Sequence, residues 1–160
     1  MARLDVSLSP EELDAYLADQ RTARVATVGP GDIPHVVPLW FVWVDGYLFV
    51  NTTRGNRTVR NLAHNPEAAA TIDDGESYAT LRGTVLVGEM RDADDDPRLD
   101  EVVAAFARKY FGGNQPHFTA WRNRFFLKLE PDRISSWDFR KIPEARARRD
   151  AERARAAGPA

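Results

Sequence analysis

The alternation of apolar and polar positions divides the chain into one capped helix followed by a series of extended segments. Ser9 and Glu12 have the S-x-x-E spacing of a capping box, and Pro10 suits the first helical position, so a helix is predicted to begin here. It is expected to end near Gln20. After it the apolar period shortens to two residues, which predicts strands. The predicted strands cover residues 24–28, 33–44, 47–52, 68–73, 78–87, 125–130 and 133–139.

The second extended segment, 33–44, is apolar on both faces, whereas a strand with one wet face would alternate. Its inward side is expected to fill a barrel, and its outward side needs a helix, a ligand or another subunit. We expect a subunit, because the chain has few helices to cover a sheet. The two sides are His35, Val37, Leu39, Phe41 and Trp43 against Val36, Pro38, Trp40, Val42 and Val44.

Two further helices and a tail complete the pattern. One helix is predicted over residues 57–64, where Asn65-Pro66 ends it. Another follows the acidic loop 92–96, with Asp96 as its cap, Pro97 at its start and Gly112 at its end. The sum is a mainly β fold, a six- to seven-stranded antiparallel split β-barrel with a few helices, followed by a basic, Ala/Arg-rich tail at residues 143–160.

Composition excludes several classes of function. The chain has 160 residues, a net charge of −2 and no cysteine, so disulfides, thiolate metal sites and a Cys nucleophile are ruled out. No signal peptide or membrane helix is indicated, and we expect a cytoplasmic protein that binds neither membrane nor nucleic acid. His35, His64 and His117 share no metal-ligand spacing, so no metal site is expected. No G-x-S-x-G, P-loop or G-x-G-x-x-G motif occurs.

The segment 51–62 is the strongest candidate for binding chemistry. A strand ends there, a Gly-containing loop follows, and a short helix begins with Arg57, Arg60 and Asn61 on one side. Free N–H groups at a helix start, the hydroxyls of Thr53 and Thr58, and several guanidinium groups together make a phosphate cradle. The alternative is a surface helix whose arginines are simply solvated.

Aromatic side chains offer a possible wall for a planar heterocycle. Trp40 is the ring expected nearest to a ligand, because it lies on the doubly apolar strand. The late Trp137 and Phe139 are further candidates, although packing in the core or at an interface explains such rings equally well. Tyr78 and Arg82, on the polar face of the predicted fifth strand, are candidates for substrate contact. No side chain stands out as a catalytic acid or base.

Taken together, these segments resemble the split-barrel flavoproteins of the pyridoxamine 5'-phosphate oxidase superfamily, most of all the branch that includes deazaflavin (F420)-dependent oxidoreductases. The similarity covers most of residues 8–140. It is carried by RVAT (24–27), DIPHVVPLWF (32–41), DGYLF (45–49), RTVRNLAHNP (57–66), LRGTV (81–85) and ISSWDF (134–139).

The resemblance implies an FMN-binding split barrel over residues 1–142, forming a homodimer with cofactor sites at the subunit interface. The cofactor would be F420 or FMN, with F420 slightly favoured because cations near the cradle suit the carboxylates of its tail. The phosphate would be held by Arg54, Asn56, Arg57, Thr58 and Arg60, beside Thr53. The ring system would lie along Val37, Pro38, Leu39 and Trp40, largely against their backbone.

The implied activity is that of an oxidoreductase transferring a hydride to or from a small organic substrate. The alternative is a non-catalytic split barrel that binds or sequesters a flavin or haem. The tail from Lys141 does not look like the substrate-binding C-terminus of a true pyridoxamine phosphate oxidase. A role in vitamin B6 synthesis is therefore not expected, and a nucleic-acid-binding tail is the remaining alternative.

Overall fold

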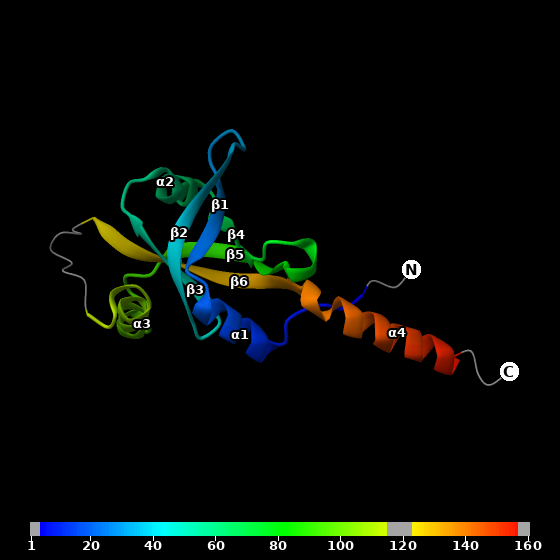
Figure 1. Cartoon of the computed structure of the whole chain (residues 1–160). Helices are drawn as coiled ribbons and strands as arrows, with labels where there is room; N and C mark the ends of the chain where they lie inside the picture. The colour runs from blue at the N-terminus through cyan, green and yellow to red at the C-terminus, as the bar shows by residue number, and fades with distance from the viewer. Residues whose placement is uncertain (1–3, 115–122, 157–160) are drawn as a thin grey trace.

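Six antiparallel strands form a closed barrel in a computed structural model that describes residues 4–114 and 123–156 (Figure 1). The strand order around the barrel is β1-β2-β3-β6-β5-β4. The predicted mainly β fold is therefore confirmed, with six strands. They are β1 (Thr22–Val28), β2 (Pro34–Val44), β3 (Tyr47–Thr53), β4 (Glu67–Asp74), β5 (Arg82–Asp92) and β6 (Arg124–Asp138).

Among the described residues, three α-helices pack against the barrel and a fourth, α4, extends from it; α1 and α2 lie at opposite ends of the barrel in Figure 1. The capping box of α1 is confirmed, since Ser9 Oγ accepts from the Glu12 N–H and a Glu12 carboxylate oxygen accepts from the Ser9 N–H. The helices are α1 (Pro10–Asp19), α2 (Arg57–His64), α3 (Leu99–Phe111) and α4 (Ile142–Ala156), with short 3₁₀ turns η1 (Tyr78–Thr80) and η3 (Phe139–Lys141).

The core has two parts that share the wall of the barrel. Inside the barrel, apolar side chains of the strands meet Leu13, Tyr16 and Leu17 of α1. Outside it, α3 packs Val102 and Phe106 onto β2, β3 and β6. Helix α3 therefore covers part of the outward side of β2, which the sequence analysis expected another subunit to cover.

Helix α3 also contacts the C-terminal end of α1. The Lys109 Nζ donates to the Leu17 carbonyl oxygen at 3.0 Å and lies 4.2 Å from the centre of the Phe41 ring. This ammonium supplies a donor to one of the carbonyl groups that a helix leaves unpaired at its C-terminus. The contact places a cation in a half-buried, largely apolar junction.

The doubly apolar character of β2 has two explanations along its length. In its second half, the outward Val42 and Val44 are buried by α3. In its first half the outward side is uncovered in the single chain, where Val36 is 61% exposed and Trp40 is 46% exposed. We refer to the uncovered part as the open face of β2; its residues are Val36, Pro38 and Trp40, and the exposed Ile33 lies just before the strand.

Several predicted boundaries were wrong. Residues 78–80 form the turn η1, and the fifth strand, predicted over 78–87, runs from Arg82 to Asp92. Residues 125–139 do not make two strands joined at Pro131-Asp132; β6 is continuous, with a bulge where Val87 pairs with Arg133 and Gly88 with Pro131. Asp96 is not the cap of α3 and Pro97 is not its first residue, because the helix begins at Leu99 after Arg98; it ends, as predicted, at the left-handed Gly112.

The bulge explains why β6 passes through a proline without stopping. A Cβ at Gly88 would lie 2.0 Å from the Glu130 carbonyl oxygen, so only glycine allows the two strands to approach this closely. Asp132 is the extra residue of the bulge, and Pro131, which has no N–H, is accommodated beside it.

The basic C-terminal segment is helical and extends away from the barrel (Figure 1). Of its described residues only Ala145 is buried. Within residues 4–114 and 123–156, no helix is long and apolar enough to cross a membrane.

Candidate functional site

The barrel has a gap between β2 and β3. These strands pair only from Phe41–Val44 to Tyr47–Val50. Beyond that point β2 follows β1 as far as Pro34, and β3 follows β6 to Thr53. The two strands therefore separate, and each leaves one edge without a strand partner.

The edge of β2 carries backbone groups that face the gap. The Tyr110 hydroxyl accepts from the Phe41 N–H at 3.0 Å and lies 2.8 Å from the Phe41 carbonyl oxygen. The same hydroxyl lies 2.6 Å from the carbonyl oxygen of Arg21, the residue just before β1. The backbone groups of Phe41 therefore face β1. Because these groups alternate along an antiparallel strand, those of Val36, Pro38 and Trp40 face the gap. Proline contributes only a carbonyl, and the other two residues contribute a donor and an acceptor each.

Helix α2 begins directly after the free edge of β3. Its cap, Asn56, accepts from the Val59 N–H at 3.0 Å, and its Nδ2 donates to Thr52 Oγ1 at 2.7 Å. The first N–H groups of a helix have no intrahelical acceptor, and the cap takes only the one at Val59. The N–H groups of Arg57 and Thr58 remain as donors at this end of the helix.

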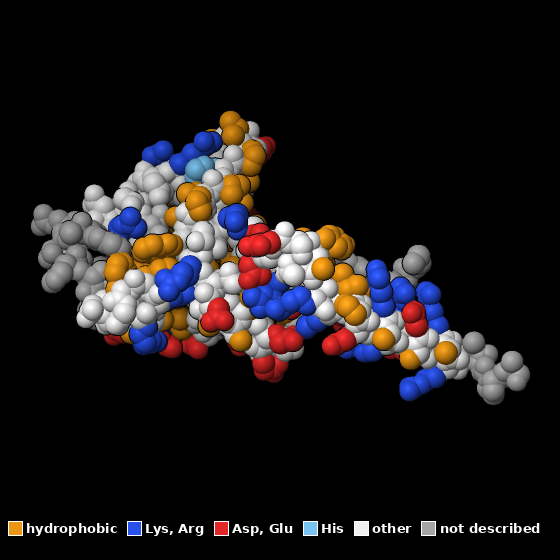
Figure 2. Space-filling model, viewed as in Figure 1, with side chains coloured by type: hydrophobic (Ala, Val, Ile, Leu, Met, Phe, Trp, Pro, Cys, Tyr) orange, Lys and Arg blue, Asp and Glu red, His pale blue; other side chains and the backbone are white. Residues whose placement is uncertain are grey.

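Two arginines of α2 are exposed beside those donors. The Arg60 Nη1 donates to the Gly55 carbonyl oxygen at 2.6 Å, which brings its guanidinium back toward the start of the helix. Across the described residues, neither Arg57 nor Arg60 forms an ion pair with a carboxylate. Figure 2 shows Lys and Arg side chains gathered over α2, close to the hydrophobic stripe of β2.

Arg54 differs from these two arginines, although the sequence grouped them. Its guanidinium forms ion pairs with Asp92, at 3.1 Å, and with Asp94, and it lies 4.2 Å from the centre of the Phe125 ring. The acidic loop was visible in the sequence as a run of aspartates. Its pairing with Arg54 was not, because only the fold brings the two segments together.

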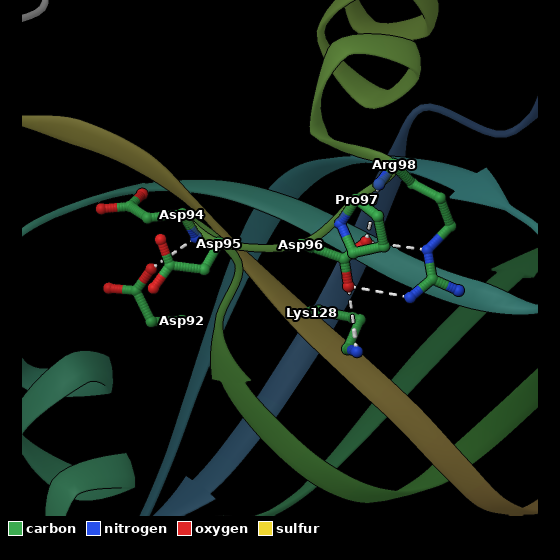
Figure 3. Close-up of a pocket in the computed structure, with 7 residues that line it drawn as sticks. All are labelled: Asp92, Asp94, Asp95, Asp96, Pro97, Arg98 and Lys128. Carbon is green, nitrogen blue, oxygen red and sulfur yellow. Dashed lines mark hydrogen bonds and ion pairs between the residues drawn. The ribbon is translucent and has the colours of Figure 1, made fainter.

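The acidic loop borders a polar hollow of about 480 Å³, shown in Figure 3. Asp96, inside it, accepts from the Arg98 side chain at 2.8 Å and pairs with Lys128 at 3.0 Å. The hydrogen bonds from Arg98, aided by Lys128, hold the pKa of Asp96 well below its usual range. Asp96 is therefore held as a carboxylate between two cations, and among the described residues no cluster of His, Asp or Glu could hold a metal ion.

The remaining polar residues of the predicted cradle divide between surface and core. Thr53 is exposed, whereas Thr58 is buried and faces inward. Asn61, expected beside the arginines, also points inward and donates to Thr27 Oγ1 at 3.1 Å. This buried bond fixes α2 on β1. A Cβ at Gly29 would lie 2.6 Å from Asn61 Oδ1, so the two segments are in close contact.

The aromatic candidates do not all meet at the gap. Trp40 stacks on Tyr110, with ring centres 4.5 Å apart and an angle of 8°, and so holds a fixed position at the edge of the open face. Trp137 packs against Gly83, at the opposite end of β6 from the cradle. His117, considered for a metal site, lies outside the described residues.

The two residues considered for substrate contact also lie at that far end of the barrel. Tyr78 lies in η1, with its ring 4.9 Å from that of Phe139. Arg82 pairs with Asp74 at 2.7 Å and lies 4.4 Å from the centre of the Tyr16 ring. Neither residue lies beside the gap, so the geometry gives no support for a role in substrate contact.

Comparison with known proteins agrees with this architecture. The family model described as pyridoxamine 5'-phosphate oxidase matches residues 9–138. No curated protein matches the chain significantly.

Several solved structures are similar over most of their length. A conserved hypothetical protein from Mycobacterium tuberculosis is 26% identical, with a TM-score of 0.78 over 89% of this chain and 92% of that one. A protein described as an F420 reductase is 25% identical, with a TM-score of 0.60 over 79% and 98% of the two chains. The heme storage protein of Vibrio cholerae shares the fold at 20% identity, with a TM-score of 0.62 over 85% and 96%.

Proposed function

Since the chain belongs to the pyridoxamine 5'-phosphate oxidase family, we propose that it is an oxidoreductase that binds FMN or the deazaflavin F420 in the gap between β2 and β3. The substrate is proposed to be a small organic molecule. The observation that carries the proposal is the group of unpaired cations and N–H donors where the edges of β2 and β3 separate. The similarity to an F420 reductase supports the same class of coenzyme.

The phosphate is assigned to the start of α2. Arg57 and Arg60 supply guanidinium groups that no carboxylate neutralises among the described residues, and the N–H groups of Arg57 and Thr58 supply two further donors. Charge-assisted hydrogen bonds to phosphate are about twice as strong as neutral ones. Thr58 acts through its backbone, since its side chain is buried.

The ring system is assigned to the free edge of β2. Val36, Pro38 and Trp40 present backbone groups to the gap, whereas Val37 and Leu39 direct theirs toward β1 and their side chains toward the barrel interior. The Trp40 ring, held by Tyr110, provides a flat apolar surface beside this edge. When bound, the coenzyme supplies the hydride chemistry; the chain supplies binding, orientation and exclusion of water.

A second copy of the chain is proposed to cover the open face of β2. Outside the barrel, Val36 pairs with Ala26, Ala26 with Ala69, and Ala69 with Val87, which makes an apolar row across four strands. Val36 at its end is 61% exposed in the single chain, and Ile33, just before β2, is 55% exposed. An apolar strip of this kind is typical of an interface between subunits, and a dimer formed there would bury the gap and its coenzyme from water.

The test is a titration of purified protein with FMN and with F420, following absorbance and fluorescence. Replacing Arg57 and Arg60 together with alanine should weaken binding by about 100-fold or more, because each arginine loses a charged hydrogen bond that contributes about 1.5 to 3 kcal/mol. The double variant Arg108→Ala/Arg146→Ala removes the same charge from exposed positions on α3 and α4 and serves as the matched control. Equal affinities for the two double variants would refute the assignment.

The same protein distinguishes an enzyme from a storage protein. Oxidation of the reduced coenzyme in the presence of a panel of small organic acceptors supports the oxidoreductase. Tight binding with no turnover of any acceptor would instead favour a non-catalytic flavin- or haem-binding role.

A further inference from the structure

Arg54 is held in place by contacts that Arg57 and Arg60 lack. Its backbone N–H donates to the Asn123 carbonyl oxygen at 2.7 Å, and its guanidinium lies over the Phe125 ring. Asp92 and Asp94 bind the two terminal nitrogens of the same guanidinium. Its charge is therefore compensated locally, three residues before the start of α2.

The acidic loop is built to keep both carboxylates on Arg54. Ala93, between the two aspartates, is buried, and its N–H donates to the Phe126 carbonyl oxygen at 3.0 Å. The Asp94 N–H donates to Asp92 Oδ1 at 2.8 Å. Anchoring the middle residue leaves the side chains of its two neighbours on the outer side, where both reach the guanidinium.

We propose that Asp92 and Asp94 are specificity-determining residues, which withhold Arg54 from the coenzyme and so favour one whose anionic charge ends at a single phosphate. This inference rests on the proposed function. FMN carries its charge on one phosphate, for which Arg57, Arg60 and the N–H groups of α2 are sufficient. The tail of F420 continues beyond its phosphate to carboxylates, which need a further cation.

The charge around Arg54 also favours FMN over F420. Asp92 and Asp94 offset its single positive charge twice over, and Asp95 in the same loop is exposed. A carboxylate-bearing tail near this loop would meet net negative charge within the screening length of about 8 Å at physiological salt. The preference for F420 that the sequence indicated depended on extra cations near the cradle, and one of them, Arg54, is paired with Asp92 and Asp94.

The experiment compares the ratio of affinities for FMN and F420 in the intact protein. In Asp92→Asn/Asp94→Asn the amide oxygen still accepts from the backbone, but Arg54 is released. Affinity for F420 should rise about tenfold, the equivalent of about 1.4 kcal/mol, because the released guanidinium can pair with a carboxylate of the tail, and affinity for FMN should rise by no more than about threefold. Adding Arg54→Gln to the double variant should abolish the gain.

Asp95→Asn is the matched control, because it removes a charge from the same loop without touching Arg54. The inference is overturned if Asp95→Asn changes the ratio as much as the double variant does, or if the double variant leaves the ratio unchanged. Binding of neither coenzyme to any form of the protein would instead refute the proposed function, so the two failures are distinguishable.

Discussion

Replacing Lys109 with methionine should change how the free energy of unfolding depends on pH. Burial, with added repulsion from Arg21, lowers the pKa of Lys109 from its ordinary value of 10.5 to about 8. The unfolded chain regains the ordinary value, so between about pH 8 and 10.5 the unfolded state binds more protons and stability rises with pH. Below about pH 8 the folded state carries the whole cost of burying the ammonium group.

The size of the effect follows from the pKa difference and from solvent exposure. If Lys109 were fully buried, the pKa difference would correspond to a change of about 3 kcal/mol in the free energy of unfolding. Because the Lys109 side chain is only half-buried, we expect about 1 to 2 kcal/mol after solvent screening. The lost hydrogen bond to the Leu17 carbonyl and the lost contact with the Phe41 ring lower the stability of the variant by an amount independent of pH.

Guanidinium chloride unfolding of both proteins at several pH values between 7 and 10.5 measures this difference. From the low to the high end of that pH range, the free energy of unfolding of the wild-type protein should increase by about 1 to 2 kcal/mol relative to that of Lys109→Met. Burial also raises the pKa of Tyr110, to about 12, but this tyrosine is present in both proteins and its effect cancels. If the free energies of unfolding of the two proteins changed equally with pH, the reasoning would be refuted. Lys109→Arg, which stays charged throughout, should lack the alkaline gain as well.

Three further outcomes are expected. Val36→Glu places a charge on the open face and should convert a dimer to a folded monomer in sedimentation, whereas Ala147→Glu on exposed α4 should not. Gly88→Ala should lower the free energy of unfolding by at least about 3 kcal/mol, because the methyl would meet backbone. Gly29→Ala should lower the free energy of unfolding by about 1 to 3 kcal/mol, because the methyl would displace the Asn61 side chain, which can move more readily than the backbone beside Gly88. Wild-type denaturation midpoints for either glycine variant would contradict the close contacts.

Local signals in the sequence were sufficient for the helices that begin at a cap. The predicted span of α2 is the observed one, because its start at Asn56 and its end at Asn65-Pro66 depend on neighbours in the chain. The gap beside it was not foreseen, since it depends on where the pairing of two strands stops. The arginines at 57 and 60 were therefore found as residues, while their position at a free strand edge required the fold.

Interactions between distant segments explain what the sequence missed. Arg54 and its carboxylate partners are 38 and 40 residues apart, so nothing in the local pattern separates it from Arg57. Pro131-Asp132 has the composition of a turn, and only Gly88 on the neighbouring strand allows β6 to continue through it. Trp40 was expected to lie near a ligand; its support from Tyr110 became visible only with α3 in place.

The place of β6 in the strand order has a consequence for biosynthesis. β6 is translated after the other five strands of the barrel, yet it lies between β3 and β5 and pairs with both. Until it is translated, the nascent chain can form at most an open sheet with two unprotected edges, which are templates for aggregation. Ribosome-bound chains that stop before residue 124 should accordingly depend on chaperones, and those extending past 138 should be released from that need.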